Sequence, residues 1–288
     1  MRVKTAAKIN LALDVTGRLP NGYHSIESVF QTVGIYDEVT VELTESGIEL
    51  SCEVPERFVS ADPIPCDERN IAYKAAREFL AENALDAGCR IHIKKGIPSQ
   101  AGMGGGSTDA AAVLYCLSEL TGKTFSSPEK LGADVPFFLM GGTAYVTGIG
   151  EKTDKISDYS GKILVIAKGK EGVSTAEAYK AIDELENPQH PDAGGLARVM
   201  AESQSEVYKY IGNLFEYAVN ISEVRDIKEI MTLFGARAAC MTGSGSAVFG
   251  IFETEEKAEE CAESLKKAGY FAVKCVTVPE SFKKEDEI

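Results

Sequence analysis

The sequence has no long hydrophobic run. It has 288 residues, of which 44% are apolar, yet no apolar segment approaches the ~20 residues that a membrane-spanning helix needs. Residues 1–15 also lack the apolar centre of a signal peptide. We therefore expect a cytoplasmic protein that has no membrane partner.

Positive charge is also scarce. The chain carries 30 basic and 44 acidic residues, which gives a net charge of -14. The basic residues form no stripe of the kind that follows a nucleic-acid backbone, so nucleic acid is excluded as a partner. A small anionic ligand is still compatible with this composition, because backbone amides and one or two lysines can bind phosphates inside an acidic protein.

Cysteine pairs of the C-x-x-C type are absent. The seven cysteines are scattered along the chain and their number is odd. This spacing predicts neither a zinc site nor a disulfide framework. We expect reduced thiols, several of them in the core.

Glycine, by contrast, is concentrated in one place. Residues 98–112 read PSQAGMGGGSTDAAA, with four glycines among the five positions 102–106. One glycine would suffice for a tight turn, whereas four indicate that a ligand approaches the main chain closely. The Ser-Thr-Asp that follows is typical of an N-cap, with a helix over 110–120, and free amides at a helix start bind anions.

The glycine segment fits neither of the two commonest phosphate motifs. A dinucleotide fingerprint is incomplete, because Ser107 stands where the third glycine belongs. A Walker loop fails because there is no lysine between residues 96 and 122. What is left is a glycine-dense turn that supplies amides to a triphosphate without a loop lysine, or an ordinary helix-entry turn.

Apolar periodicity predicts interleaved strands and helices. Predicted strands cover residues 9–15, 37–43, 89–94, 142–148, 162–169, 246–252 and 270–278. Predicted helices cover residues 70–82, 174–185, 206–219, 226–236 and 255–269. This pattern favours two α/β domains. The polar stretch 150–162 places their boundary near residue 155, and the last six residues, KKEDEI, are expected to form a solvated tail.

Three segments resemble the GHMP kinases, a family of small-molecule kinases. They are AAKINLALDVTG (6–17), the glycine segment at 98–112, and CMTGSGSAVFGIF (240–252). Each match alone is weak, but all three occur in the family's order. The resemblance implies an α+β, two-domain GHMP kinase fold. It has an N-terminal ATP-binding α/β domain (1–155) that carries the phosphate loop, a C-terminal ferredoxin-like α/β domain (156–288), and an active site in the cleft between them.

Two further segments resemble one branch of that family, whose substrate carries a cytidine diphosphate group and which serves non-mevalonate isoprenoid synthesis. They are LPNGYHSIESVFQTV (19–33) and KLGADVPFFLMGGTAYVTGIGE (130–151). The resemblance implies ATP and Mg²⁺ as cofactors and an alcohol as phosphoryl acceptor. Alternatives are a GHMP kinase for another small alcohol, such as homoserine or mevalonate, and a catalytically silent ligand sensor with the same fold.

Phosphoryl transfer to an alcohol needs a base within reach of the hydroxyl proton. Asp134 is the candidate base, because it lies in LGADVPFF, whose apolar residues exclude water. Lys8 resembles the family lysine that pairs with this aspartate. The structural alternatives are a turn or cap role for Asp134 and a solvated strand-edge position for Lys8.

The resemblance assigns the remaining cofactor contacts. From their chemistry rather than from the resemblance, Ser107 or Thr108 is the candidate for reaching Mg²⁺, because hard divalent cations prefer oxygen ligands, and Asp109 is expected to cap the helix. Met103 stands where the family has leucine. The predicted phosphate cradle comprises Pro98, Gly102, Met103, Gly104, Gly105, Gly106, Ser107 and Thr108. Asn70 and Lys95 match positions that line the family's adenine pocket.

Tyr23 and His24 match the pair that grips the cytosine in the resembled branch. An imidazole can donate and accept hydrogen bonds, and an aromatic ring can stack on a pyrimidine. Asn10 is expected beside them, Thr175 as a hydrogen-bonding residue, and Tyr179 stacked on the other face of the base. The structural alternative is a packed tyrosine beside a surface histidine.

The chain departs from the family between the glycine segment and Asp134. TGKTFSSPEKLGADVP (121–136) allows barely one turn, whereas the resembled family usually has a full helix there. We therefore expect a shortened wall beside the triphosphate.

Overall fold

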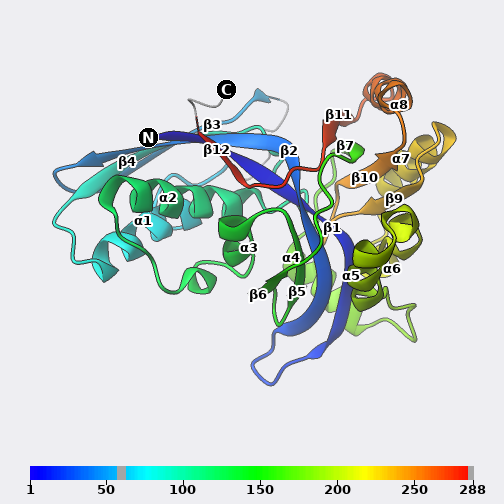
Figure 1. The fold of residues 1–288 in the computed structure, drawn as a ribbon, viewed down its shortest axis with the longest axis horizontal. Coiled ribbons are helices and arrows are strands. Elements are labelled where there is room, and N and C mark those ends of the chain that lie inside the picture. The colour runs from blue at the N-terminus through cyan, green and yellow to red at the C-terminus, as the bar shows by residue number, and fades with distance from the viewer. Residues whose placement is uncertain (57–62, 285–288) are drawn as a thin grey trace.

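The protein is described here by a computed structural model covering residues 1–56 and 63–284, whose strands form two sheets (Figure 1). Within these residues the larger sheet has eight strands, in the order β12-β1-β2-β4-β3, with β5 and β6 continuing from β2 and β8 pairing with β1. Its strands are β1 (Arg2–Arg18), β2 (His24–Thr44), β3 (Ile48–Glu53), β4 (Gly88–Lys94), β5 (Thr143–Thr147), β6 (Lys152–Lys155), β8 (Gly212–Asn213) and β12 (Phe282–Lys284).

The smaller sheet has four described strands in the order β11-β7-β10-β9, all antiparallel. They are β7 (Ile163–Lys168), β9 (Ala238–Met241), β10 (Val248–Phe252) and β11 (Phe271–Val276). In chain order this arrangement is 4-1-3-2, and helices α7 (Ser222–Leu233) and α8 (Glu255–Lys267) pack against it. The predicted ferredoxin-like C-terminal unit is confirmed.

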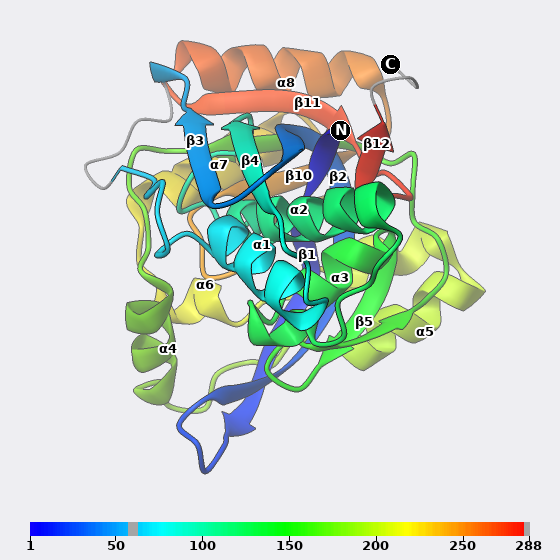
Figure 2. The same ribbon diagram turned by 90° about the vertical axis from the view of Figure 1, so that its left-hand side faces the viewer.

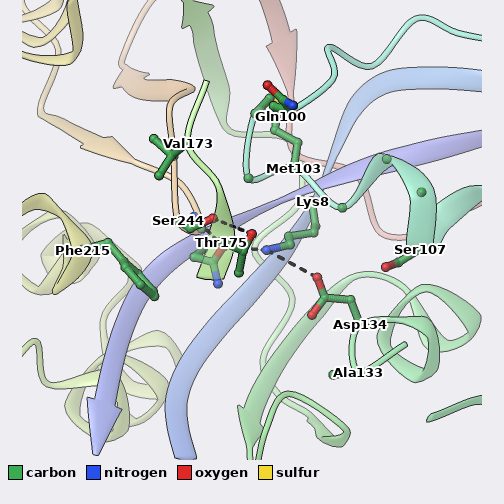
Figure 3. A pocket seen from close by; sticks show the side chains of 18 of the residues that line it. Lys8, Gln100, Met103, Ser107, Ala133, Asp134, Val173, Thr175, Phe215 and Ser244 are labelled. Atoms are coloured by element: carbon green, nitrogen blue, oxygen red, sulfur yellow. Dashed lines mark hydrogen bonds and ion pairs between the residues drawn. The ribbon is translucent and has the colours of Figure 1, made fainter. Parts of the chain in front are cut away.

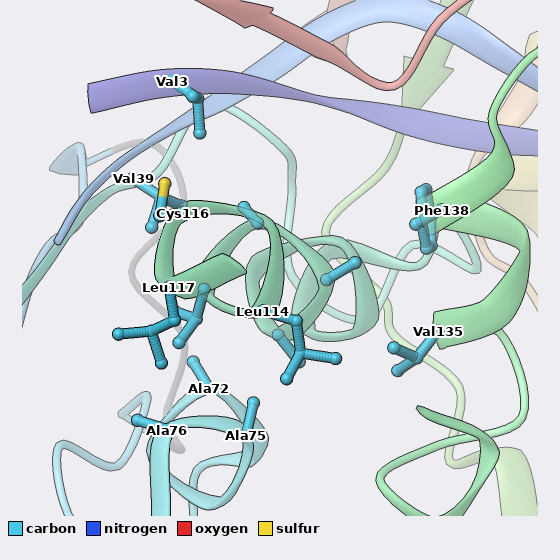
Figure 4. Close-up of a cluster of buried hydrophobic side chains, with 14 of the residues drawn as sticks. Val3, Val39, Ala72, Ala75, Ala76, Leu114, Cys116, Leu117, Val135 and Phe138 are labelled. Carbon is cyan, nitrogen blue, oxygen red and sulfur yellow. The ribbon is translucent and has the colours of Figure 1, made fainter. Parts of the chain in front are cut away.

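Helices α1 (Ile71–Glu82) and α2 (Gly105–Thr121) lie side by side against the larger sheet, as Figure 2 shows. Ala72 and Ala75 of α1 face Leu114 and Leu117 of α2, and Val39 of the sheet lies above them (Figure 4). All five side chains are buried. Small alanines on one helix allow the leucines of the other to fill the space between them, so this core fixes where α2 begins.

The remaining helices are short, and several differ from the prediction. They are α3 (Val135–Met140), α4 (Thr175–Asp183), α5 (Ala193–Glu202), α6 (Phe215–Ala218) and the 3-10 helices η2 (Pro128–Lys130) and η3 (Gln204–Tyr210). The single helix predicted over 206–219 is wrong, because η3, β8 and α6 share that segment. The shortened segment before Asp134 is confirmed as the three-residue helix η2.

Two segments of the C-terminal half return to the larger sheet. Strand β8 pairs with β1 in parallel, and β12 pairs with β1 antiparallel. Lys283 and Lys284 of the predicted tail therefore lie in a strand, while residues 285–288 lie outside the described residues. The division of the chain at residue 155 falls between β6 and β7 and stays a prediction.

Candidate active site

The glycine segment leads directly into α2. Gly104 occupies the N-cap position with a left-handed φ of 73° and provides no side-chain cap. The first bond within the helix runs from the Thr108 amide to the Gly104 carbonyl, at 2.9 Å. The amides of residues 105–107 precede that bond and have no protein acceptor among the described residues. Together with the helix dipole they form an anion-binding site.

The Ser-Thr-Asp cluster does not precede the helix, so its prediction as an N-cap is wrong. Ser107, Thr108 and Asp109 lie inside the first turns of α2. Thr108 is fully buried, and its hydroxyl donates to the Ala6 carbonyl at 2.8 Å. The hypothesis that Thr108 reaches a metal ion or a phosphate does not fit this position, because its hydroxyl ties α2 to β1 instead.

The two glycine-rich segments meet backbone to backbone. A Cβ atom on Gly102, whose φ is +71°, would lie 2.1 Å from the Thr242 carbonyl oxygen. A Cβ atom on Gly104 would lie 2.7 Å from the Phe138 ring and 3.3 Å from the Lys8 side chain. Side chains are excluded at both positions, and their absence brings the phosphate loop against Lys8.

Lys8 and Asp134, 126 positions apart in the chain, face each other across the cavity (Figure 3). The Lys8 ammonium lies 3.7 Å from Asp134 Oδ2 and donates to Asn10 Oδ1 at 2.8 Å. Only 6% of the Lys8 side chain is exposed, so a solvated strand-edge position is wrong for this residue. Burial lowers the pKa of Lys8 below its ordinary value, and the Asp134 charge opposes that shift.

Asp134 stands immediately before α3 but does not cap it. Its side chain makes no capping hydrogen bond to α3. The carboxylate is 26% exposed and is directed toward Lys8, as Figure 3 shows. The cap alternative is therefore wrong, and the carboxylate is accessible to a ligand in the cavity.

Lys95 and Asn70 lie on the other side of the phosphate loop. The Lys95 ammonium pairs with Asp109 at 2.6 Å and with Asp37, both of them buried. Burial by itself lowers the pKa of Lys95, but the carboxylates of Asp109 and Asp37 outweigh it and raise the pKa. Asn70 caps α1 by accepting from the Ala72 amide at 2.9 Å. Asp109 is thus an ion-pair partner and not a cap.

His24 and Tyr179 contact each other. Their ring centroids are 4.7 Å apart with an interplanar angle of 16°, and His24 Nε2 lies 2.7 Å from Asp183 Oδ1. Two rings this close leave no room for a third ring between them, so Tyr179 covers a face of His24. The expectation that Tyr179 stacks on the base stays a prediction. Burial, with a smaller contribution from the Asp134 charge, raises the pKa of Tyr179 to about 12. Tyr23 is 61% exposed.

Asn10 and Thr175 connect the cavity to the third glycine-rich segment. Asn10 is buried, and its side-chain oxygen accepts from the Gly243 amide at 3.0 Å in addition to Lys8. The Thr175 hydroxyl lies 3.1 Å from the Ser244 hydroxyl (Figure 3). Asn10 therefore orients Lys8 as well as bordering the cavity.

One cavity of about 990 Å³ joins most of these groups. Every predicted site residue except Thr108 lines it. Asp183 and Gln100 also line it, and the sequence reasoning missed both. A single large cavity with convergent polar groups is the usual form of a small-molecule site.

The comparisons with known proteins agree with this arrangement. The family model described as "GHMP kinases N terminal domain" matches residues 70–142, and "GHMP kinases C terminal" matches residues 178–270. The chain belongs to the GHMP kinase family. This GHMP kinase also matches curated relatives along most of its length.

Two of these relatives are named 4-diphosphocytidyl-2-C-methyl-D-erythritol kinase. The protein from Clostridium botulinum (strain Alaska E43 / Type E3) is 40% identical over 275 residues, covering 92% of this chain and 96% of its own. The protein from Desulfitobacterium hafniense (strain Y51) is 42% identical over 277 residues, covering 92% and 91%.

Solved structures match the fold. A crystal structure of 4-(cytidine 5'-diphospho)-2C-methyl-D-erythritol kinase has a TM-score of 0.80 and 30% identity, covering 96% of this chain and 99% of its own. A homoserine kinase from Cytophaga hutchinsonii has a TM-score of 0.76 at 18% identity, covering 98% and 96%. The second match shows the fold alone. In the described part of the chain, no helix is long and apolar enough to cross a membrane.

Proposed function

We propose that this GHMP kinase transfers the γ-phosphoryl group of ATP to the 2-hydroxyl of 4-diphosphocytidyl-2-C-methyl-D-erythritol. The observation that carries the proposal is the Lys8–Asp134 pair, which faces the same cavity as the free amides at the start of α2. The names of two relatives that are 40% and 42% identical to this chain support the substrate. The reaction belongs to non-mevalonate isoprenoid synthesis, and we expect it to take place in the cytoplasm.

The triphosphate of ATP fits the glycine loop. Amides 105–107 point out of the helix start and supply donors without a loop lysine. Asn70 and Lys95 line the same cavity, which supports the proposal that they border the adenine. Both are held by other groups of the protein, so this wall is organised before the nucleotide binds.

Mg²⁺ fits the oxygen donors at the loop. The described residues contain no group of three or more His, Cys, Asp or Glu side chains that could hold a metal ion, so a site built wholly from protein ligands is not indicated there. Mg²⁺ characteristically binds through substrate phosphates, waters and one or two protein oxygens. Ser107, at the loop and on the cavity wall, is the residue we propose as a direct ligand. When bound, the ion would offset charge on the triphosphate.

Asp134 accepts the proton of the substrate hydroxyl in this mechanism. The Lys8 ammonium lies 3.7 Å from that carboxylate and polarises the attacking oxygen. The hydroxyl then attacks the γ-phosphorus in line, ADP leaves, and no phosphoenzyme forms. Positioned general bases typically contribute about 10²- to 10⁴-fold to a rate.

A comparison of acceptors tests the substrate. ADP release from Mg-ATP is measured separately with 4-diphosphocytidyl-2-C-methyl-D-erythritol, homoserine and mevalonate. Turnover on the cytidine substrate alone is the expected result. Turnover on another acceptor would overturn the proposed substrate but not the proposed role of the phosphate loop. ATP binding without any turnover would favour a ligand sensor.

A further inference from the structure

Asp183 approaches the base-reading side of the cavity from α4. It is the last residue of that helix, and its Oδ1 lies 2.7 Å from His24 Nε2. Arg18 lies 3.4 Å from the other carboxylate oxygen. Both His24 and Asp183 line the cavity, although only 10% of the His24 side chain is exposed.

We propose that Asp183 is a positioning residue that fixes the tautomer of His24 and thereby selects cytosine over uracil. The inference rests on the proposed function, because it concerns how that substrate's base is read. No direct contact between Asp183 and the substrate is needed, since Asp183 acts through the imidazole.

The tautomer follows from the hydrogen bond. An ionised carboxylate only accepts hydrogen bonds, so the proton between the two groups belongs to His24 Nε2. In line with this, the hydrogen bond from His24 lowers the pKa of Asp183 below its ordinary value. A neutral imidazole that carries its proton on Nε2 presents Nδ1 as an acceptor. Among the described residues, Nδ1 has no partner of its own.

The Tyr179 ring fixes the plane of this imidazole. It stacks on His24 at 4.7 Å and packs edge-on against Phe215, with centroids 5.0 Å apart. One face of His24 is therefore covered, and its Nδ1 edge is the part left to meet a ligand. A half-turn of the ring would keep this stacking but break the hydrogen bond between Nε2 and Asp183, so Asp183 decides which ring nitrogen faces the ligand.

An acceptor at that edge discriminates between the pyrimidines. The pairing edge of cytosine has one donor, the exocyclic N4 amine, whereas uracil has a carbonyl oxygen at the same place. Nδ1 therefore pairs with the cytosine amine and opposes the uracil oxygen. Bound uracil would leave the buried Nδ1 acceptor without a donor, and an unpaired buried polar group is what makes discrimination between two ligands strong.

The test compares the wild-type chain with Asp183→Asn, using cytidine 5'-diphosphate and uridine 5'-diphosphate as probes. The asparagine amide can donate to Nε2 and so permits the opposite tautomer. Calorimetry gives the dissociation constants of both probes, and their ratio measures the preference for cytidine diphosphate over uridine diphosphate. We expect this ratio to be smaller in the variant by a factor on the order of ten. The KM for the cytidine substrate should rise while the KM for ATP does not.

Two controls separate this role from a general loss of structure. Glu184→Gln removes a charge from the next residue, which does not line the cavity, and should leave the preference unchanged. The ¹⁵N shifts of the His24 ring should report an Nε2-protonated imidazole in the wild type and a mixture in Asp183→Asn. An unchanged preference in Asp183→Asn would overturn the proposal and leave the proposed function intact. A wild-type chain with no preference for cytidine diphosphate would overturn both the proposal and the cytidine substrate.

Discussion

At the scale of single residues, the site depends on charges held away from water. Lys8 is 6% exposed and Lys95 is 5% exposed, but their surroundings differ. Lys95 pairs with two buried carboxylates, whereas Lys8 faces one carboxylate, that of Asp134, which is partly exposed. The resemblance predicted that Lys8 pairs with Asp134, but nothing in the sequence predicted the partners of Lys95. Asp37 lies 58 positions from Lys95 and looks like an ordinary polar residue of an alternating strand.

Lys8→Met should separate catalysis from stability. Burial of the charged Lys8 opposes folding. After the substitution, the side-chain oxygen of Asn10 still accepts hydrogen bonds from the Gly243 amide and the Thr242 hydroxyl. We expect kcat to fall by at least about 10²-fold and the free energy of unfolding to stay within about 1 kcal/mol of the wild type or to increase. Steady-state kinetics and urea denaturation check this, and a large loss of stability would contradict it.

The same residue predicts a dependence of stability on pH. The pKa of Lys8 is lowered from 10.5 by folding, so between the two values the unfolded chain binds more protons at Lys8 than the folded chain does. Stability from this group therefore rises with pH through that window, because the cost of burying the charge disappears. The wild type should gain stability relative to Lys8→Met from neutral pH to about pH 10 in urea denaturation. A difference that does not change with pH would argue against a lowered pKa.

Lys95→Met should be strongly destabilising. It leaves the carboxylates of Asp37 and Asp109 buried without their cation, a loss that typically costs about 3–5 kcal/mol of unfolding free energy. The neighbouring Lys94→Met is the matched control, because Lys94 is exposed and its ion pair with Glu53 spans 3.9 Å. That control should cost less than about 1 kcal/mol. Equal losses in the two variants would contradict the role given to the buried cluster.

At the scale of elements, strong apolar periodicity predicted α1 and α8 well. Segments with irregular structure were predicted wrongly or not at all. The segment 206–219 has helical spacing, but Gly212 and Asn213 pair with β1 as strand β8. Helix α5 has glycines at its second and third positions, and glycine has low helix propensity. The helix forms with Asp192 accepting from the Gly195 amide at 2.7 Å. Pairing with a distant strand determined the first segment, and no local pattern shows such pairing. In the second segment the two glycines outweighed the local capping signal of Asp192 in the prediction.

Gly102→Ala tests the contact between the two glycine-rich segments. Its Cβ would lie 2.1 Å from the Thr242 carbonyl at a φ of +71°. Gly161→Ala is the matched control, with a φ of +78° and open space around the new Cβ. The control should cost about 1–2 kcal/mol of unfolding free energy for strain alone. Gly102→Ala should cost more and also raise the KM for ATP, and similar values for both would show that the segments do not need this contact.

At the scale of the molecule, the site exists because distant segments meet in one cavity. The motifs predicted which residues belong to it, and all but Thr108 line the cavity. Composition and spacing could not show that Lys8 and Asp134 meet, since 126 positions separate them. Nor could they show that α4 places Tyr179 and Asp183 against His24, because that contact depends on how the two halves of the chain pack.

Asp134→Asn tests the central claim most directly. The substitution keeps the shape of the side chain and removes the group that accepts the proton. We measure kcat with 4-diphosphocytidyl-2-C-methyl-D-erythritol and the dissociation constant of Mg-ATP for both proteins. The account predicts that kcat falls by about 10²- to 10⁴-fold while ATP affinity is unchanged. An unchanged kcat would remove Asp134 from the mechanism and contradict the account.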